Sequence, residues 1–150
     1  MQVVSGPGQL AAGDYRALAE FRYQIRRFLR FSEQAARSAG LEPQQYQLLL
    51  ALKGLPNESR RRIGEVAERL QIQHHSTVEL VDRLARRGLV RRRRSEQDRR
   101  EVLLELTARG EKILQELALH HRSELRESGP ALIAALRKAL RGDGGRQPRS

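Results

Sequence analysis

The sequence predicts a mainly α-helical fold with one small β-hairpin, and two patterns in it lead to this prediction. Apolar residues recur every three or four positions through most of the chain, which is typical of helices with one buried face. Between Gly88 and Thr107, two short runs rich in Val and Leu instead flank a polar, arginine-rich stretch. Such runs are typical of a hairpin. The chain of 150 residues has the length of one domain with a sizeable core.

The first predicted element is a long helix that ends at Gly40. Its apolar seam alternates steps of three and four, at positions 18, 21, 25, 28, 32, 35 and 39. Pro43 begins a second helix with Tyr46, Leu49 and Leu50 on its inner face, and Gly54 begins the break that ends it.

Two shorter helices follow, joined by a turn at residues 71–72. The apolar residues of each fall at i, i+3, i+4 and i+7, and the first of these helices is expected to span about three turns. Gly88 follows the second, where a left-handed C-cap is expected. Two short amphipathic helices joined by a tight turn form a helix-turn-helix, whose second helix can enter a major groove. The two apolar sets are Ile63, Val66, Ala67 and Leu70, then Thr77, Leu80, Val81 and Leu84.

Alternation with a period of two then replaces the helical pattern. Val102, Leu104 and Leu106 alternate with Leu103 and Glu105, and residues 89–90 begin the opposing strand before the turn RRRRSEQDRR. A hairpin directly after a helix-turn-helix is a wing, so the predicted fold is a winged helix-turn-helix over residues 41–106.

The remaining chain is predicted to form two further helices and flexible ends. Thr107 can cap a helix that carries Ile113, Leu114 and Leu117, and Pro130 can begin a last one. The apolar seams of residues 14–40 and 107–141 have no long partner in so small a lobe, so we expect these helices to form a homodimer with a second copy. Residues 1–13 and 142–150, rich in Gly, Pro and polar residues, are expected to be flexible.

Charge and composition limit the partners of the chain. The net charge is +11, and residues 83–100 contain nine arginines against two acidic residues. This imbalance suits a polyanion, either nucleic acid or an anionic membrane surface. The basic residues concentrate at a hairpin, not on the polar face of an amphipathic helix, which disfavours the membrane. With no cysteine, no secretion signal and no apolar run of membrane-spanning length, we expect a cytoplasmic protein without disulfides.

Several motifs in one order resemble the MarR (multiple antibiotic resistance regulator) family. They are LVDRLARRGLV at residues 80–90, the Asp-x-Arg of Asp98 and Arg100, and the pair Leu106–Thr107, and the similarity extends from about Asp14 to Leu140. The resemblance implies a homodimeric bacterial or archaeal transcriptional regulator, usually a repressor. It also implies an effector pocket between the dimerisation helices and the DNA-binding lobe.

The resemblance also implies roles for particular residues. Arg100 would be the wing-tip arginine that enters the minor groove, and Asp98 would hold it in position. The start of the recognition helix would contact base edges through His74, His75 and Ser76, with Glu79 and Arg83 further along the same side. The full set of expected DNA-binding residues is Gln73, His74, His75, Ser76, Glu79, Arg83, Arg86, Arg92, Arg94, Asp98, Arg99 and Arg100. The hairpin has an alternative explanation, because charged edges also prevent pairing with other strands.

Effector and metal sites are less well marked. Arg22, Arg26 and Arg30 form an i, i+4, i+8 stripe that, with Tyr46, could hold a small aromatic or anionic effector, although a solvated stripe is the preferred interpretation. The histidines form two adjacent pairs, which cannot chelate one ion as i, i+4 histidines do. We expect no metal and no cofactor, a polar DNA-facing role for His74 and His75, and a solvated helix face for His120 and His121.

No pattern in the sequence indicates an enzyme. Phosphate-binding loops, metal-ligand clusters and nucleophile motifs are absent from it. The leading prediction is a sequence-specific DNA-binding regulator. The alternatives are a metal-responsive regulator of the same fold and a non-specific architectural nucleic-acid-binding protein, which would show little preference between operator and random duplex.

Overall fold

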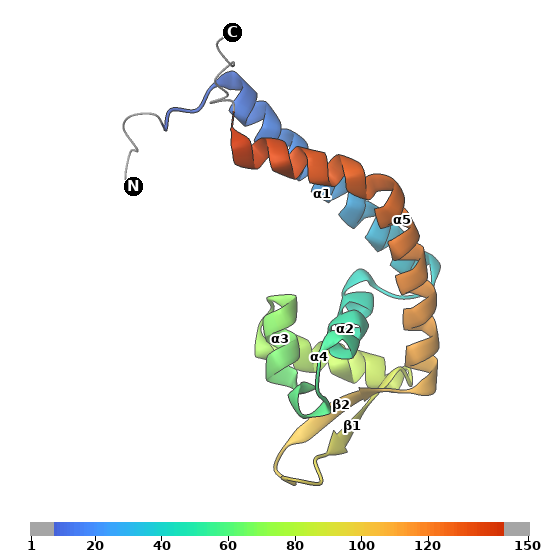
Figure 1. Cartoon of the computed structure of the whole chain (residues 1–150). Coiled ribbons are helices and arrows are strands. Elements are labelled where there is room, and N and C mark those ends of the chain that lie inside the picture. Colours follow the sequence, from blue (N-terminus) through green and yellow to red (C-terminus); the bar gives the residue numbers. More distant parts are fainter. Residues whose placement is uncertain (1–7, 143–150) are drawn as a thin grey trace. The chain divides into compact units, whose positions relative to one another are not determined.

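The computed structural model describes residues 8–142, and it is mainly helical with one antiparallel hairpin (Figure 1). The chain divides into two compact units. The central unit is residues 32–121, and the terminal unit is formed by residues 1–31 and 122–150, as far as they are described. The elements in chain order are α1 (Ala12–Ser38), α2 (Pro43–Gly54), the 3-10 turn η1 (Glu58–Arg60), α3 (Ile63–Leu70), α4 (His74–Arg86), β1 (Val90–Arg94), β2 (Val102–Leu106) and α5 (Ala108–Arg141).

The helix-turn-helix of the central unit is confirmed. All four residues of the predicted α4 stripe are buried, and so are Val66 and Ala67 of α3. Helix α3 has eight residues, about two turns where about three were expected. On α2, Tyr46 and Leu49 face inward as predicted, but Leu50 is exposed and Leu48 is buried in its place. Three consecutive leucines cannot all lie on one helix face. Because Leu48 and Leu49 are buried, Leu50 points outward.

The junction between α4 and the hairpin has the predicted left-handed glycine. Gly88 has φ +70°, its N–H donates to the carbonyl of Ala85 at 3.0 Å, and the N–H of Leu89 donates to the carbonyl of Leu84 at 3.0 Å. This arrangement satisfies carbonyls at the helix end and turns the chain directly into β1.

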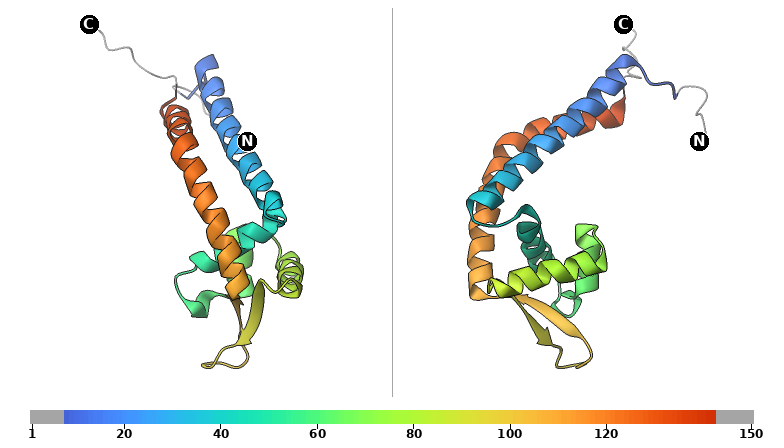
Figure 2. Two further views of the ribbon diagram at one scale, coloured as in Figure 1. Left: turned by 90° about the vertical axis from the view of Figure 1, so that its right-hand side faces the viewer. Right: turned by 180° about the vertical axis from the view of Figure 1, so that it is seen from behind.

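The hairpin differs from its prediction in two ways. Residues 91–94 belong to β1, paired from Arg91↔Glu105 to Arg94↔Val102, so they are strand residues and the turn is residues 95–101. Simple alternation in β2 is also wrong, because Leu103 and Leu104 are both buried while Val102 is exposed. The N–H of Leu104 donates to the carbonyl of Arg61 at 2.7 Å, so the second edge of β2 is also covered. The turn of the hairpin projects away from α2 in all the views (Figure 2).

Helix α5 is continuous, so the prediction that a last helix begins at Pro130 is wrong. Pro130 lies inside α5. A proline there removes one backbone N–H donor, but its fixed φ is helical. The Ser128 hydroxyl, two residues earlier, donates to the carbonyl of Glu124 at 2.9 Å. The cap at Thr107 is confirmed, because its hydroxyl accepts the N–H of Gly110 at 3.0 Å.

The terminal unit contains the outer parts of α1 and α5, which run alongside each other (Figures 1 and 2). Nine of the twelve large apolar residues that are exposed in the described chain belong to this unit. Helix α1 begins at Ala12, so the predicted flexible stretch 1–13 extends two residues too far, and the predictions for residues 1–7 and 143–150 lie outside the described residues. Within residues 8–142, none of the helices has the length and apolar character needed to cross a bilayer.

Candidate nucleic-acid interface

The exposed side of α4 carries the predicted base-contacting residues. Gln73, His74, His75, Glu79 and Arg83 are exposed, and Ser76 is half-buried. The opposite side of the helix is fixed by its buried stripe, in which Thr77 also donates its hydroxyl to the carbonyl of Gln73 at 3.0 Å. The start of α4 is therefore held by its buried face and by the Thr77 hydrogen bond, and its polar side chains are exposed on the other face.

The turn of the hairpin is held by its own backbone and two short polar side chains. The buried Ser95 hydroxyl accepts the N–H of Gln97 at 3.3 Å and of Asp98 at 3.4 Å. The Asp98 carboxylate accepts the N–H of Arg100 at 3.0 Å, and the Asp98 carbonyl accepts the N–H of Glu101 at 3.0 Å. Asp98 thus fixes Arg100 through its main chain rather than its guanidinium.

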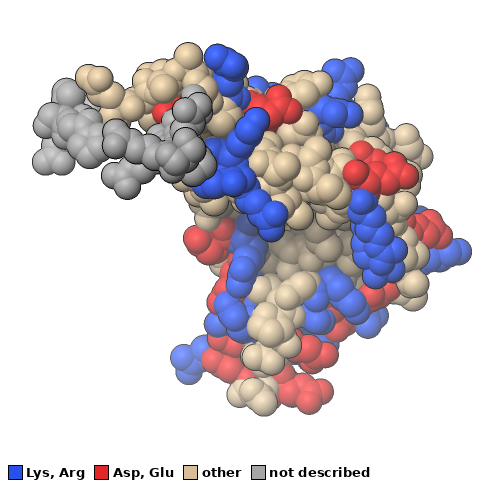
Figure 3. Space-filling model, turned by 45° about the horizontal axis from the view of Figure 1, so that its top comes forward, with Lys and Arg blue, Asp and Glu red and all other residues tan. Residues whose placement is uncertain are grey.

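Most of the arginines in residues 83–100 are engaged by neighbouring side chains. Arg92 pairs with Asp82 of α4 at 2.6 Å, and Glu105 of β2 pairs with both Arg91 and Arg93. The hydrogen bond from Arg91 is the largest cause that lowers the pKa of Glu105 below its ordinary value. The space-filling view shows acidic side chains lying next to basic ones on parts of the face that it presents (Figure 3). Three further contacts are Arg93 with Glu58 at 3.4 Å, Arg83 with Glu42 at 3.8 Å and Arg87 with Gln45 at 3.0 Å.

Four arginines of this stretch have no side-chain partner within the described part of the chain. Arg86 donates only to the carbonyl of Asp82 at 3.4 Å, and Arg94 donates only to the carbonyl of Arg99 at 2.8 Å. The exposed side chains of Arg99 and Arg100 make no hydrogen bond or ion pair within the described residues. Within residues 83–100, the positive charge available to a polyanion is therefore concentrated at the hairpin turn and at the end of α4.

Sequence reasoning missed the carboxylates that neutralise this hairpin. Asp82 pairs with Arg92, and both Glu58 and Glu105 pair with Arg93. Glu105 lies directly across from Arg91 in the hairpin register, so correct strand bounds would have indicated that pair.

The expected solvated position of His121 is wrong. His121 is 6% exposed, and its ring stacks on that of Tyr46 with the centroids 4.4 Å apart. The spacing of Leu114, Leu117 and His121, which share one helix face, is the sequence signal that could have indicated this burial. His120, His74 and His75 are exposed, and the described residues contain no group of three or more His, Asp or Glu side chains arranged to hold a metal ion.

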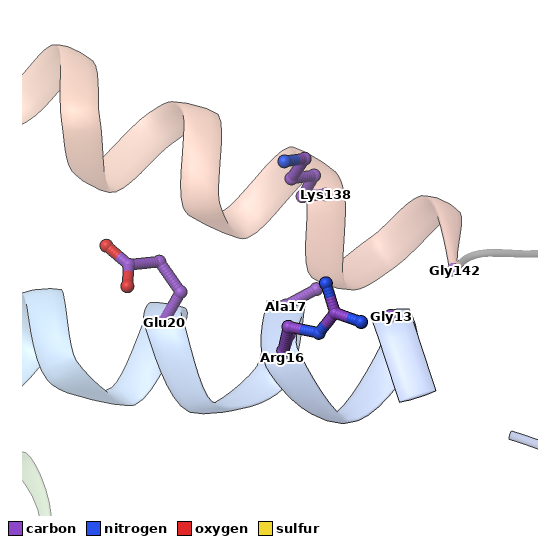
Figure 4. A pocket seen from close by; sticks show the side chains of 6 residues that line it. All are labelled: Gly13, Arg16, Ala17, Glu20, Lys138 and Gly142. Atoms are coloured by element: carbon purple, nitrogen blue, oxygen red, sulfur yellow. The ribbon is translucent and has the colours of Figure 1, made fainter. Parts of the chain in front are cut away.

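The predicted effector residues lie in different units. Tyr46 is buried in the central unit, where desolvation raises the pKa of its phenol, and Arg26 and Arg30 are exposed on α1 in the terminal unit. A cavity of about 610 Å³ in the terminal unit is lined by other residues (Figure 4). These residues are Gly13, Arg16, Ala17, Glu20, Lys138 and Gly142.

One family model and one curated relative match the central unit. The model is that of the MarR family, and it matches residues 39–101. The relative is an uncharacterized HTH-type transcriptional regulator of Bacillus subtilis, YfiV, which is 36% identical over 63 residues. That match covers 42% of this chain and 39% of YfiV, so it spans about two fifths of either protein.

Solved structures extend the likeness to most of the chain. AbsC, a MarR family transcriptional regulator from Streptomyces coelicolor, has a TM-score of 0.71 at 24% identity, covering 88% of this chain and 92% of AbsC. A mutant of S. aureus MepR bound to an oligodeoxyribonucleotide has a TM-score of 0.62 at 21% identity, covering 85% of this chain and 96% of MepR. The fold is that of these regulators, and residues 39–101 match the model of the MarR family, the family that the sequence motifs resemble.

Proposed function

We propose that this protein is a sequence-specific DNA-binding transcriptional regulator that represses its genes as a homodimer on a pseudo-palindromic operator. The observation that carries the proposal is an exposed polar face on α4 together with a hairpin turn in which the side chains of Arg99 and Arg100 have no partner in the described chain. A helix supplies donors and acceptors for base edges, and uncommitted arginines supply charge for phosphates and the minor groove.

The two elements have different roles in this proposal. His75 and Ser76 at the start of α4 contact base edges in the major groove, with Gln73, His74, Glu79 and Arg83 beside them. Arg100 enters the minor groove, where its positive charge meets a negative potential that increases as the groove narrows. Asp98 positions Arg100, which is supported by its 3.0 Å bond to the Arg100 N–H. Arg86, Arg94 and Arg99 bind phosphates.

Arg92 has a smaller role than the sequence suggested. Its guanidinium already pairs with Asp82 at 2.6 Å, and both side chains remain partly exposed. A phosphate would have to replace that carboxylate as its partner. We therefore propose that Arg92 mainly ties the wing to α4 and contributes little to phosphate binding.

A homodimer is supported by the apolar surface of the terminal unit. Leu18, Ile133, Leu136 and Leu140 each expose at least 39% of their surface, and burying them against a second copy would remove that apolar area from water. A dimer would present two α4 helices to half-sites about 10 bp apart. Light scattering should then give twice the chain mass of 17.1 kDa.

The regulation of DNA binding by a small effector is also part of the proposal. In the central unit, the face of Tyr46 is covered by His121, so an aromatic ligand would have to displace that ring. Arg26 and Arg30 remain exposed and able to bind an anionic group. Thermal unfolding with a panel of aromatic carboxylates would test this part, since a ligand of the folded state raises the midpoint.

Selection of bound sequences from a random duplex pool tests the DNA-binding function. Successive rounds of capture by the full chain should enrich a pseudo-palindrome with half-sites about one helical turn apart. Protein binding to the enriched duplex should be roughly 10³-fold or more tighter than binding to a random duplex at the same salt concentration. A pool that stays unenriched, despite measurable binding, would instead indicate the non-specific architectural alternative.

A further inference from the structure

We propose that Gln45 is a positioning residue for DNA recognition, because its buried amide holds the end of α4 against α2 through Arg87. The inference rests on the proposed function. Gln45 does not contact the exposed face of α4, and its expected effect is on the orientation of that helix rather than on any base. The proposal depends on three features: the burial of Gln45, the position of Arg87 at the α4 end and the contacts of the neighbouring Tyr46.

The amide of Gln45 is buried and its oxygen accepts two hydrogen bonds. Only 4% of Gln45 is exposed. The oxygen accepts the N–H of Glu42 at 3.0 Å, which is one half of the capping box that begins α2. It also accepts the guanidinium of Arg87 at 3.0 Å. A hydrogen bond from a charged donor to a buried acceptor is costly to remove, because the acceptor stays buried without that partner.

Arg87 lies at the C-terminal end of α4, where the helix joins the hairpin. It is the C-cap of α4 and directly precedes Gly88, whose carbonyl accepts the Thr107 hydroxyl at 2.6 Å. One turn earlier, Arg83 lies 3.8 Å from the Glu42 carboxylate. The first turn of α2 therefore contacts the last turn of α4 through both Gln45 and Glu42.

A small change at this end of α4 is enlarged at the other end. Helix α4 has 13 residues, so its axis is about 18 Å long from the first to the last residue. A tilt of roughly 10° about the Arg87 end would move the start of the helix by about 3 Å. Polar contacts of His75 and Ser76 to base edges would not survive that displacement, because hydrogen bonds weaken steeply beyond their normal range. Phosphate contacts by flexible arginines would adjust to it.

The next residue on α2, Tyr46, contacts a different helix. The ring of Tyr46 stacks on His121 of α5, whose Nδ1 lies 2.7 Å from the Leu117 carbonyl and whose Nε2 lies 2.7 Å from the Ser32 hydroxyl. A carbonyl only accepts, so Nδ1 carries the proton. Within the central unit, the first turn of α2 thus contacts α5 through Tyr46 and the end of α4 through Gln45, and Ser32 of α1 contacts the same histidine of α5.

Two substitutions of similar size separate positioning from general stability. Gln45→Leu removes the acceptor, whereas Gln45→Glu keeps an oxygen for both Glu42 N–H and Arg87. Gln47→Leu, at an exposed position of the same helix, is the matched control. Each full-length variant is titrated against the duplex enriched by selection and against a random duplex, at one salt concentration and with the folded fraction measured by circular dichroism.

The expected result is a loss of discrimination. Gln45→Leu should weaken binding to the enriched duplex by roughly 10-fold, about the effect of one good base contact, and change binding to the random duplex by less than about 2-fold. Gln45→Glu and Gln47→Leu should bind both duplexes as the parent does. If Gln45→Leu does not fold, Arg87→Ala removes the same hydrogen bond from the α4 side and should give the same loss.

Two results would overturn the inference. One is binding of the enriched duplex by Gln45→Leu, or by Arg87→Ala in its place, at parental strength. The other is an equal loss on both duplexes, which would indicate a general structural or charge effect. A parent protein that does not prefer the enriched duplex would instead contradict the proposed function itself, so the two failures are distinguishable.

Discussion

Two arginines of the hairpin allow a matched test of which charges bind DNA. Arg91 and Arg99 are both exposed, and replacing either by alanine removes one positive charge from each protomer. They differ in their partners, because Arg91 pairs with Glu105 while Arg99 has no side-chain partner in the described chain. We therefore expect Arg99→Ala to remove a phosphate contact and Arg91→Ala to remove mainly an internal ion pair.

The size of the effect follows from counterion release. The logarithm of the binding constant falls with the logarithm of the salt concentration by about 0.9 for each phosphate neutralised. Arg99→Ala removes two such contacts from a dimer, so the slope should become shallower by about 1.8. Between about 50 and about 200 mM salt, this difference changes the ratio of parental to variant affinity by roughly 10-fold. For Arg91→Ala the slope should change by less than about 0.5.

Fluorescence anisotropy with a labelled random duplex measures both slopes, since this contribution does not depend on sequence. Titrations of the parent, Arg99→Ala and Arg91→Ala at four or more salt concentrations would define each line. Equal slope changes for the two variants would refute the distinction between paired and unpaired arginines. An unchanged slope for Arg99→Ala would remove that residue from the DNA contact.

Two further predictions concern the hairpin and its junction with α5. A Cβ at Gly110 would lie 2.1 Å from the backbone oxygen of Leu89, so Gly110→Ala should lower the free energy of unfolding by roughly 3 kcal/mol. At Gly64 nothing lies within 4 Å of an added Cβ, so the control Gly64→Ala should change the free energy of unfolding by less than about 1 kcal/mol. A small effect of Gly110→Ala in denaturant unfolding would contradict this packing. The pKa of Glu105 is lowered by its bond from Arg91, so the stability it contributes should be present above its ordinary pKa of 4.5 and should be lost as the pH falls through the lowered value. Unfolding of the parent and Glu105→Gln should therefore differ at neutral pH and converge in acid, and a difference that persists below both pKa values would argue against this ion pair.

The sequence predicted the fold well where local chemistry determines structure. The α4 stripe is set by a helical period, and Gly88 by the need for a positive φ at a helix end. It predicted less well where long-range contacts decide. Burial of both Leu103 and Leu104 depends on neighbours on both sides of β2, including the backbone of Arg61 some forty positions earlier. Pro130 inside a helix shows the same limit, because a proline is compatible both with a helix start and with a helix interior that tolerates one missing bond.

The sequence indicated which residues make up the candidate site better than it indicated which side chains they pair with. The exposed polar residues of α4 and the arginines of the hairpin could be identified from their positions. The sequence could not show which arginines lack an ion-pair partner, because Asp82 lies ten positions from Arg92 and Glu58 lies 35 positions from Arg93. The burial of Gln45 and His121 also depends on elements distant in the chain, since Gln45 contacts Arg87 and His121 contacts Ser32.

A panel of single-base variants of the enriched duplex tests most directly whether α4 specifies the sequence and the wing supplies affinity. Arg100→Ala should weaken binding to every member of the panel and change the order of preference only near the edges of the site, where the minor groove is contacted. His75→Ala should alter the preference at particular inner positions by about 1 to 3 kcal/mol. Both variants are measured at one salt concentration with the folded fraction monitored. Parental binding by Arg100→Ala, or an unchanged order of preference for His75→Ala, would contradict this division of roles.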